Sequence, residues 1–146
     1  MSIVFVYGTL MRRCGNHRLL ETSTLLGRAW TLPEYELLSL GGCPGLVPAG
    51  KTSVAGELYR VTPEVLADLD RLEGHPTFYR REPLKLATAR LLFATDGARR
   101  EVVGPKAEVI QGYVLQRPSR GLERIESGSW RRHVADRYPR RIGGVR

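Results

Sequence analysis

Residues 62–74, TPEVLADLDRLEG, carry the clearest helix signal in this chain of 146 residues. Thr62 suits the N-cap, Pro63 suits the first helical position, and Gly74 suits the residue that ends a helix. Around this segment the sequence is divided into short β-branched and aromatic runs separated by glycine and proline, which is typical of strands. One internal helix among about six or seven short strands predicts an α+β fold whose sheet is curled or closed into a barrel.

The expected strands lie on both sides of that helix. We expect them at residues 3–7, 25–32, 35–40, 52–61, 79–94 and 107–116, with a hairpin through 95–97 to 101–103. Helical turns are expected at residues 16–22, 121–125 and 129–137, and residues 41–45 have the composition of a loop. Gly56, inside an expected strand, indicates a bend, a bulge or a close backbone approach.

The composition narrows the class of protein. Hydrophobic residues make up 42% of the chain and charged residues 26%, which is enough for a core and not typical of a disordered chain. No run approaches the ~18 apolar residues of a transmembrane helix, and the N-terminus lacks a signal-peptide pattern. With only two cysteines, we expect no disulfide framework and a reduced, cytoplasmic location. The length fits a single domain over residues 1–146.

The net charge of +8 is unevenly distributed. Arginine supplies 20 of the 23 basic residues, and residues 120–146 hold eight arginines against three acids. A basic tail could contact nucleic acid or a membrane surface. However, no Lys/Arg run exceeds two residues, and no aromatic residues alternate with the arginines as stacking platforms would. We therefore expect a solvated C-terminal extension from about residue 118, with neither nucleic acid nor a membrane as partner.

The helix directs one carboxylate toward the core. At ~100° per residue, Glu73 falls inside the arc of the helix's valine and leucines, whereas its other charged residues fall outside that arc. Burial and the negative helix C-terminus both disfavour the anion, and a carboxylate held in this way is a candidate general base. The alternative is a frayed final-turn glutamate that pairs with Arg80 or Arg81 at the surface.

The first expected strand ends in Tyr7-Gly8-Thr9-Leu10. A turn from a buried strand into glycine exposes successive backbone N–H groups, and such groups can hold a carboxylate or an oxyanion. The alternative is an ordinary strand-to-loop turn, because a Gly-Thr pair alone is a weak signal.

A metal site is the first competing hypothesis. Cys14 and His17 have the spacing of metal ligands, but a zinc site needs about four ligands. The remaining candidates, Cys43, His75 and His133, are scattered along the chain, so we expect no metal.

Other reactive side chains have structural explanations. His75 lies in a Gly-His-Pro turn with no nucleophile elbow before it, which is typical of a loop histidine. Ser129 suits a helix N-cap rather than a hydrolase nucleophile. Glu57 and Glu82 remain rival carboxylates, although a structural hydrogen-bonding role is equally expected for Glu57.

Taken together, these residues resemble the γ-glutamyl cyclotransferase-like family, which includes γ-glutamylamine cyclotransferases and AIG2-like proteins. The resemblance runs in order from residue 3 to about residue 116, and its most specific parts are YGTL and LDRLEG. The segments that carry it are VFVYGTL (4–10), NH (16–17), GLVP (45–48), VAGELY (54–59), LDRLEG (69–74), FYRR (78–81) and YV (113–114).

The resemblance implies both a fold and a reaction. The fold would be a small mixed β-barrel of five to six strands with short flanking helices. The reaction would release 5-oxoproline from a γ-glutamyl compound, with Glu73 as the catalytic acid/base and no cofactor. The loop from Tyr7 to Leu10 would bind substrate oxygens through backbone N–H groups, and Tyr79 would lie near the same pocket.

The residues themselves fit this chemistry. The substrate's α-amine attacks its own γ-carbonyl, so no serine or cysteine nucleophile is needed, but an ammonium group of pKa ~8 needs a base. The sequence therefore predicts a cytoplasmic cyclotransferase acting on a small γ-glutamyl amine or γ-glutamyl amino acid. The alternative is a catalytically idle module of the same fold that binds a small acid or a partner. Neither the leaving amine nor the oligomeric state is predicted.

Overall fold

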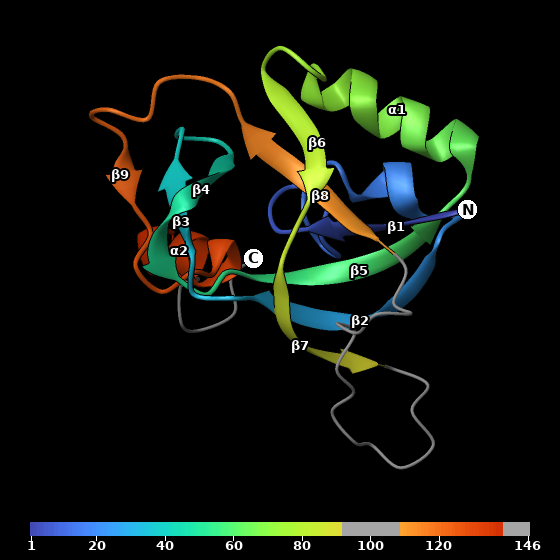
Figure 1. The fold of residues 1–146 in the computed structure, drawn as a ribbon, viewed down its shortest axis with the longest axis horizontal. Helices are drawn as coiled ribbons and strands as arrows, with labels where there is room; N and C mark the ends of the chain where they lie inside the picture. The colour runs from blue at the N-terminus through green and yellow to red at the C-terminus, as the bar shows by residue number, and fades with distance from the viewer. Residues whose placement is uncertain (92–108, 139–146) are drawn as a thin grey trace, which may run out of the picture.

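The computed structural model describes residues 1–91 and 109–138. In these ranges strands, a short 3-10 helix and two α-helices surround one core (Figure 1). In chain order they are β1 (Ser2–Val6), η1 (His17–Leu20), β2 (Thr24–Thr31), β3 (Tyr35–Ser39), β4 (Pro44–Thr52), β5 (Ala55–Val61), α1 (Pro63–Glu73), β6 (Tyr79–Pro83), β7 (Leu86–Leu91), β8 (Ile110–Leu115), β9 (Glu123–Arg124) and α2 (Trp130–Arg137). The expected hairpin through 95–97 lies outside the described residues.

The predicted α+β class is confirmed. The described strands form one nine-stranded sheet in the order β7-β2-β5-β1-β8-β4-β3-β9, with β6 paired to β8. The sheet is mixed, because β1 runs antiparallel to β5 and parallel to β8. Within the described ranges the end strands β7 and β9 do not pair with each other, so the sheet is open rather than a closed barrel. It also has more strands than the five to six expected.

Three boundaries differ from the expected ones. The single strand expected at 79–94 is two strands, because the chain turns after Pro83 and β6 pairs with β8 whereas β7 pairs with β2. The expected loop at 41–45 already contains the start of β4, which forms a hairpin with β3. The helical turn expected at 121–125 is instead the short strand β9, because Glu123 and Arg124 pair with the end of β3.

The helix signals are confirmed. The Thr62 hydroxyl accepts a hydrogen bond from the Val65 amide at 3.2 Å, and Gly74 ends α1 in the left-handed region with φ 65°. Ser129 caps α2 in the same way as Thr62 caps α1, and η1 lies within the turn expected at 16–22. Gly56 marks a close approach, since a Cβ there would meet the Phe5 ring.

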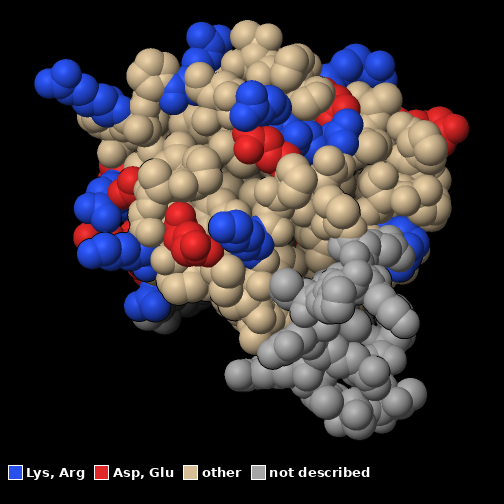
Figure 2. Space-filling model, in the orientation of Figure 1, with Lys and Arg blue, Asp and Glu red and all other residues tan. Residues whose placement is uncertain are grey.

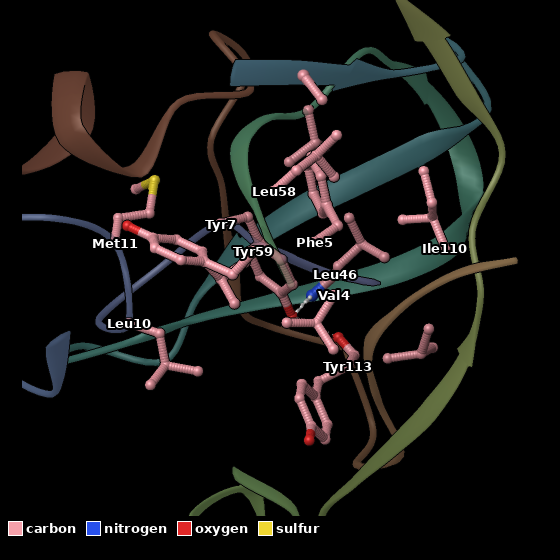
Figure 3. Close-up of a cluster of buried hydrophobic side chains, with 14 of the residues drawn as sticks. Val4, Phe5, Tyr7, Leu10, Met11, Leu46, Leu58, Tyr59, Ile110 and Tyr113 are labelled. Carbon is pink, nitrogen blue, oxygen red and sulfur yellow. Dashed lines mark hydrogen bonds between the residues drawn. The ribbon is translucent and has the colours of Figure 1, made fainter. Parts of the chain in front are cut away.

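Strand β1 occupies the centre of the core. It lies between β5 and β8, and its Val4 and Phe5 side chains are fully buried. Figure 3 shows its neighbours meeting around it: Leu46 of β4, Leu58 of β5 and Ile110 of β8. A strand held on both sides has a fixed end, so β1 sets the position of the loop that follows it.

The C-terminal segment is part of this fold up to residue 138. Ile125 and Trp130 are buried in the same core as β1. Four arginines of this segment form ion pairs: Arg124 with Glu36, Arg131 with Glu57, Arg132 with Asp136 and Arg137 with Glu123. The expectation of a solvated extension is therefore wrong for this part, while residues 139–146 lie outside the described ranges.

The charges on one face of the molecule are mixed in sign. Figure 2 shows basic and acidic side chains interspersed over this face rather than gathered in a single basic area. Among the described residues, no helix has the length and apolar character needed to cross a bilayer.

Candidate active site

A cavity of about 360 Å³ lies where the end of β1 meets the end of α1. Its wall comes from the end of β1 and the loop after it, the start of β4, the last turn of α1, the start of β6 and one residue of β8. All six sequence-predicted site residues line it: Tyr7, Gly8, Thr9, Leu10, Glu73 and Tyr79. Segments far apart in the sequence thus meet at one small concave site, although the roles of these residues remain predictions.

Glu73 is half-buried, and burial raises its pKa to about 7. Among the described lining residues it is the only acid, and Arg71 is the only cation. The Arg71 guanidinium pairs with Asp68 on the exposed surface of α1. Glu73 therefore faces the cavity without a compensating cation among the residues described.

The two arginines expected as alternative partners of Glu73 form ion pairs with other carboxylates. Arg80 pairs with Glu82 at 2.9 Å, and Arg81 holds Asp70 with an Nε–Oδ1 distance of 3.0 Å. The hypothesis of a surface ion pair between Glu73 and either arginine is therefore wrong.

Three tyrosine hydroxyls share the cavity wall with Glu73. Burial is the largest cause that raises the pKa of Tyr7, Tyr79 and Tyr113, and the Glu73 charge raises each of them further. All three hydroxyls therefore stay protonated and neutral near neutral pH. Tyr113 was not predicted as a site residue, because nothing local in its strand indicates a contact with α1, 43 residues away along the chain.

The loop after β1 folds back on itself. The Met11 amide donates to the Gly8 carbonyl at 3.1 Å, and Asn16 donates to the Thr9 carbonyl and hydroxyl, both at 2.9 Å. Within the described ranges, the N–H groups of Gly8, Thr9 and Leu10 donate to no protein acceptor. Gly8, Thr9 and Leu10 line the cavity, and backbone N–H groups without an acceptor are suited to an anionic oxygen.

Gly8 is required by the close packing of this loop. A Cβ at Gly8 would lie 2.7 Å from Cδ and Cγ of Pro44, and the proline ring cannot rotate away. We expect Gly8→Ala to lower the free energy of unfolding by about 1–3 kcal/mol, the cost of overpacking, measured by urea denaturation. Gly15→Ala in the same loop is the control, because a Cβ there meets nothing within 4 Å. Equal stability of the two variants would contradict this packing.

The rival carboxylates lie outside the cavity wall. Glu57 is 1% exposed and accepts hydrogen bonds from the Arg12 amide, the Tyr59 hydroxyl and the Arg131 guanidinium. Burial alone would raise the pKa of Glu57. The hydrogen-bond donors and positive charges around it lower the pKa by more than burial raises it, so the net shift is downward. A carboxylate held ionised in this way is a structural anchor rather than a base.

The histidines and cysteines have structural positions. His75 Nδ1 accepts from the Arg81 amide at 2.9 Å, and His17 Nδ1 lies 3.0 Å from the Leu10 carbonyl oxygen. Cys14 lines a different cavity, beside α2, whereas Cys43 lines the cavity of Glu73. The described part of the chain brings together no three side chains of the kinds that ligate metals.

The described structure thus combines a nine-stranded mixed sheet with a cavity lined by one half-buried carboxylate and by the loop after β1. The family model for gamma-glutamyl cyclotransferase, AIG2-like, matches residues 4–132. The chain therefore belongs to the AIG2-like gamma-glutamyl cyclotransferase family.

Individual relatives support this assignment. The gamma-glutamylcyclotransferase family protein YtfP of Escherichia coli K12 is 35% identical over 127 residues, which is 87% of this chain and 94% of that protein. A putative gamma-glutamylcyclotransferase of Vibrio cholerae is 51% identical over 83 residues, 57% of this chain and 71% of the relative. The crystal structure of an AIG2-like protein from Mus musculus matches with a TM-score of 0.65 and 27% identity, over 87% of each chain.

Proposed function

We propose that this protein is a γ-glutamyl cyclotransferase that releases 5-oxoproline and a free amine or amino acid from a small γ-glutamyl compound. The observation that carries the proposal is the Glu73 carboxylate, which lines a cavity without a cationic partner among the described residues and has a pKa of about 7. A carboxylate of this pKa can take up and return a proton near neutral pH. A module that only binds anionic γ-glutamyl groups gains nothing from such a group.

The proposed reaction needs one bond made and one broken. The substrate's α-amine nitrogen bonds to its own γ-carbonyl carbon, and the bond between that carbon and the leaving nitrogen breaks. Glu73 removes a proton from the α-ammonium group and returns it to the leaving nitrogen, so the carboxylate is regenerated. The second proton that the α-nitrogen loses as it becomes the ring amide is balanced by the free amine, which leaves as an ammonium ion. Holding the chain of the substrate folded supplies much of the barrier reduction, because the attack is intramolecular.

The loop after β1 has the complementary task. Its free N–H groups at Gly8, Thr9 and Leu10 can hold the substrate's α-carboxylate, or the carbonyl oxygen as negative charge develops on it. The Arg71 guanidinium lies mostly in solvent and pairs with Asp68, so the N–H groups of the loop are the donors that the proposal assigns to the substrate's anionic oxygens.

Product analysis tests the proposal directly. Purified protein is incubated with a panel of γ-glutamyl amines and γ-glutamyl amino acids, and 5-oxoproline and the free amine are quantified. We expect equal amounts of both products from at least one compound. No 5-oxoproline from any member of the panel would favour a catalytically idle binding module instead.

The pKa of Glu73 predicts the pH dependence of the reaction. Because only the ionised carboxylate accepts a proton, kcat/KM should rise with pH through an apparent pKa of about 7 rather than the ~4.3 of a free glutamate. The measurement is 5-oxoproline release between about pH 5 and pH 9. Glu82→Gln is the control and should keep the same profile, since Glu82 pairs with Arg80 outside the cavity. A rate already at its plateau at pH 5 would contradict the assignment.

A further inference from the structure

The hydrogen-bond polarity of the Tyr113 hydroxyl is fixed by the protein. Its oxygen lies 2.7 Å from Oδ1 of Asp70 and donates its proton there. Burial raises the pKa of Asp70, but hydrogen bonds from Arg81 and Tyr113 outweigh burial and lower it, so Asp70 is an ionised carboxylate that can only accept. The single hydroxyl proton of Tyr113 is therefore held in the hydrogen bond to Asp70. Toward the cavity, the Tyr113 oxygen can only accept a hydrogen bond.

The Asp70 carboxylate is itself held on both oxygens. Arg81 Nε lies 3.0 Å from Oδ1 and Nη2 lies 3.1 Å from Oδ2, a two-point contact that fixes the plane of the carboxylate. Arg81 Nη1 also donates to Gln111 at 2.7 Å. This network joins α1, β6 and β8, and Asp70 lies one helical turn before Glu73.

The two other tyrosines of the cavity wall also have fixed hydrogen bonds. Tyr79 donates to the Pro44 carbonyl at 2.7 Å, so its oxygen also accepts, with the Cys43 sulfur 3.8 Å away. Tyr7 is saturated, because it donates to the Tyr113 carbonyl at 2.6 Å and accepts from the Leu46 amide at 3.1 Å. Tyr113 and Tyr79 thus present acceptor oxygens on one part of the wall, whereas the loop after β1 presents N–H donors.

We propose that the Tyr113 hydroxyl oxygen accepts an N–H of the substrate's α-ammonium group, and that the Asp70–Arg81 pair is the positioning unit that keeps this oxygen an acceptor. The proposal rests on the function proposed above and adds how the amino-acid head of the substrate is recognised. An ammonium group has donors only, so it fits the acceptors of Tyr113 and Glu73. The carboxylate on the same carbon atom then faces the N–H groups of the loop.

Binding of two simple ligands tests this without turnover. L-glutamate and glutarate carry the same two carboxylates, and only L-glutamate has the α-ammonium group. We expect the wild type to prefer L-glutamate in calorimetric titration, and Tyr113→Phe to reduce that preference about tenfold, the effect of losing one hydrogen bond to a charged group. Tyr35→Phe is the control and should leave the preference unchanged, since Tyr35 is a buried tyrosine that bonds to the Lys85 amide outside the cavity.

The positioning role of Asp70 has its own readout. Asp70→Ala releases the Tyr113 proton to turn toward the ligand, so it should also reduce the preference for L-glutamate while thermal melts confirm folding. If Asp70 acts through Tyr113, the double variant should show no greater loss than Tyr113→Phe alone. Additive losses would overturn the positioning role, and a partial return of the preference in Asp70→Asn, which keeps one acceptor oxygen, would support it.

The outcomes separate this inference from the proposed reaction. A wild type that prefers L-glutamate but releases no 5-oxoproline from any compound would overturn the reaction and leave the ammonium site standing. A wild type that releases 5-oxoproline while Tyr113→Phe keeps both its KM and its preference for L-glutamate would overturn the ammonium site alone. A wild type without that preference also overturns it.

Discussion

Glu73→Gln is expected to lower the rate of 5-oxoproline release by about 10²–10⁴-fold, the usual contribution of general acid–base catalysis. Glutamine keeps the shape of the side chain and its hydrogen-bonding capacity, but it cannot accept a proton from the substrate's α-ammonium group. Because the glutamine amide keeps an acceptor oxygen for the α-ammonium group and the loop after β1 is untouched, KM should change less than kcat. The residual activity should also lack the rise with pH through about 7.

The folding of this variant is a control with a definite sign. Burial raises the pKa of Glu73 above that of the unfolded chain, so ionisation of Glu73 costs stability as the pH rises through its folded pKa. Removing the charge should therefore leave the melting temperature at pH 8 equal to or above that of the wild type. Near-full activity in a folded Glu73→Gln variant would contradict the assignment of Glu73 as the base.

The burial of Glu73 was predictable from the sequence, whereas its lack of a partner was not. Helical periodicity alone placed its carboxylate inside the apolar arc of α1, which is where the structure has it. From the sequence, Arg80 and Arg81 were possible partners of Glu73. The pairing of β6 with β8 explains why Arg81 does not pair with Glu73. That register brings Arg81 beside Gln111 and Tyr113, where it binds Asp70 instead.

The strands were less predictable than the helices because their signals are not local. Thr62, Gly74 and Ser129 act on backbone groups within a few residues, so their sequence neighbourhood is sufficient. Strand β4 begins with Pro44 and contains further proline and glycine, which is a loop composition. It is a strand because β3 and β8 pair with it on either side, and such long-range pairing overrides local propensity.

Tyr113 shows the same limit within the site. Helical periodicity for Glu73 and the family resemblance for Gly8 predicted two residues that the structure places on the wall of one cavity, while their roles stay predictions. Tyr113 was not predicted to line the cavity, because its hydroxyl is held there by a hydrogen bond to Asp70 on another element. Sequence reasoning also treated the C-terminal arginines as a solvated tail, although Arg131 reaches Glu57 on the central sheet.

Glu57→Ala is expected to lower the free energy of unfolding by about 2–6 kcal/mol, the cost of leaving two hydrogen-bond donors without their acceptor. The Glu57 side chain is 2% exposed, and it is the acceptor for the Arg12 amide at 2.8 Å and the Tyr59 hydroxyl at 3.0 Å. Without the carboxylate these two donors lose their acceptor, at about 1–3 kcal/mol for each orphaned group. The guanidinium groups of Arg12 and Arg131 are partly exposed, so water can replace their contacts and they add little.

The pH dependence distinguishes this structural carboxylate from the proposed base. Although burial alone would raise the pKa of Glu57, its donors bring the net value below that of a free carboxyl. Its contribution is therefore complete above the unfolded pKa of ~4.3 and is lost as the pH falls through the folded pKa. In urea denaturation the difference in unfolding free energy between wild type and Glu57→Ala should be large at pH 7 and shrink below about pH 4.

The control variant Glu82→Ala removes a more exposed ion pair and should cost at most about 1 kcal/mol. If Glu57→Ala were as stable as Glu82→Ala at pH 7, Glu57 would not be the structural anchor of the loop after β1, where it holds the Arg12 amide. The contrast with Glu73, whose pKa is shifted in the opposite direction, would then lose its structural basis.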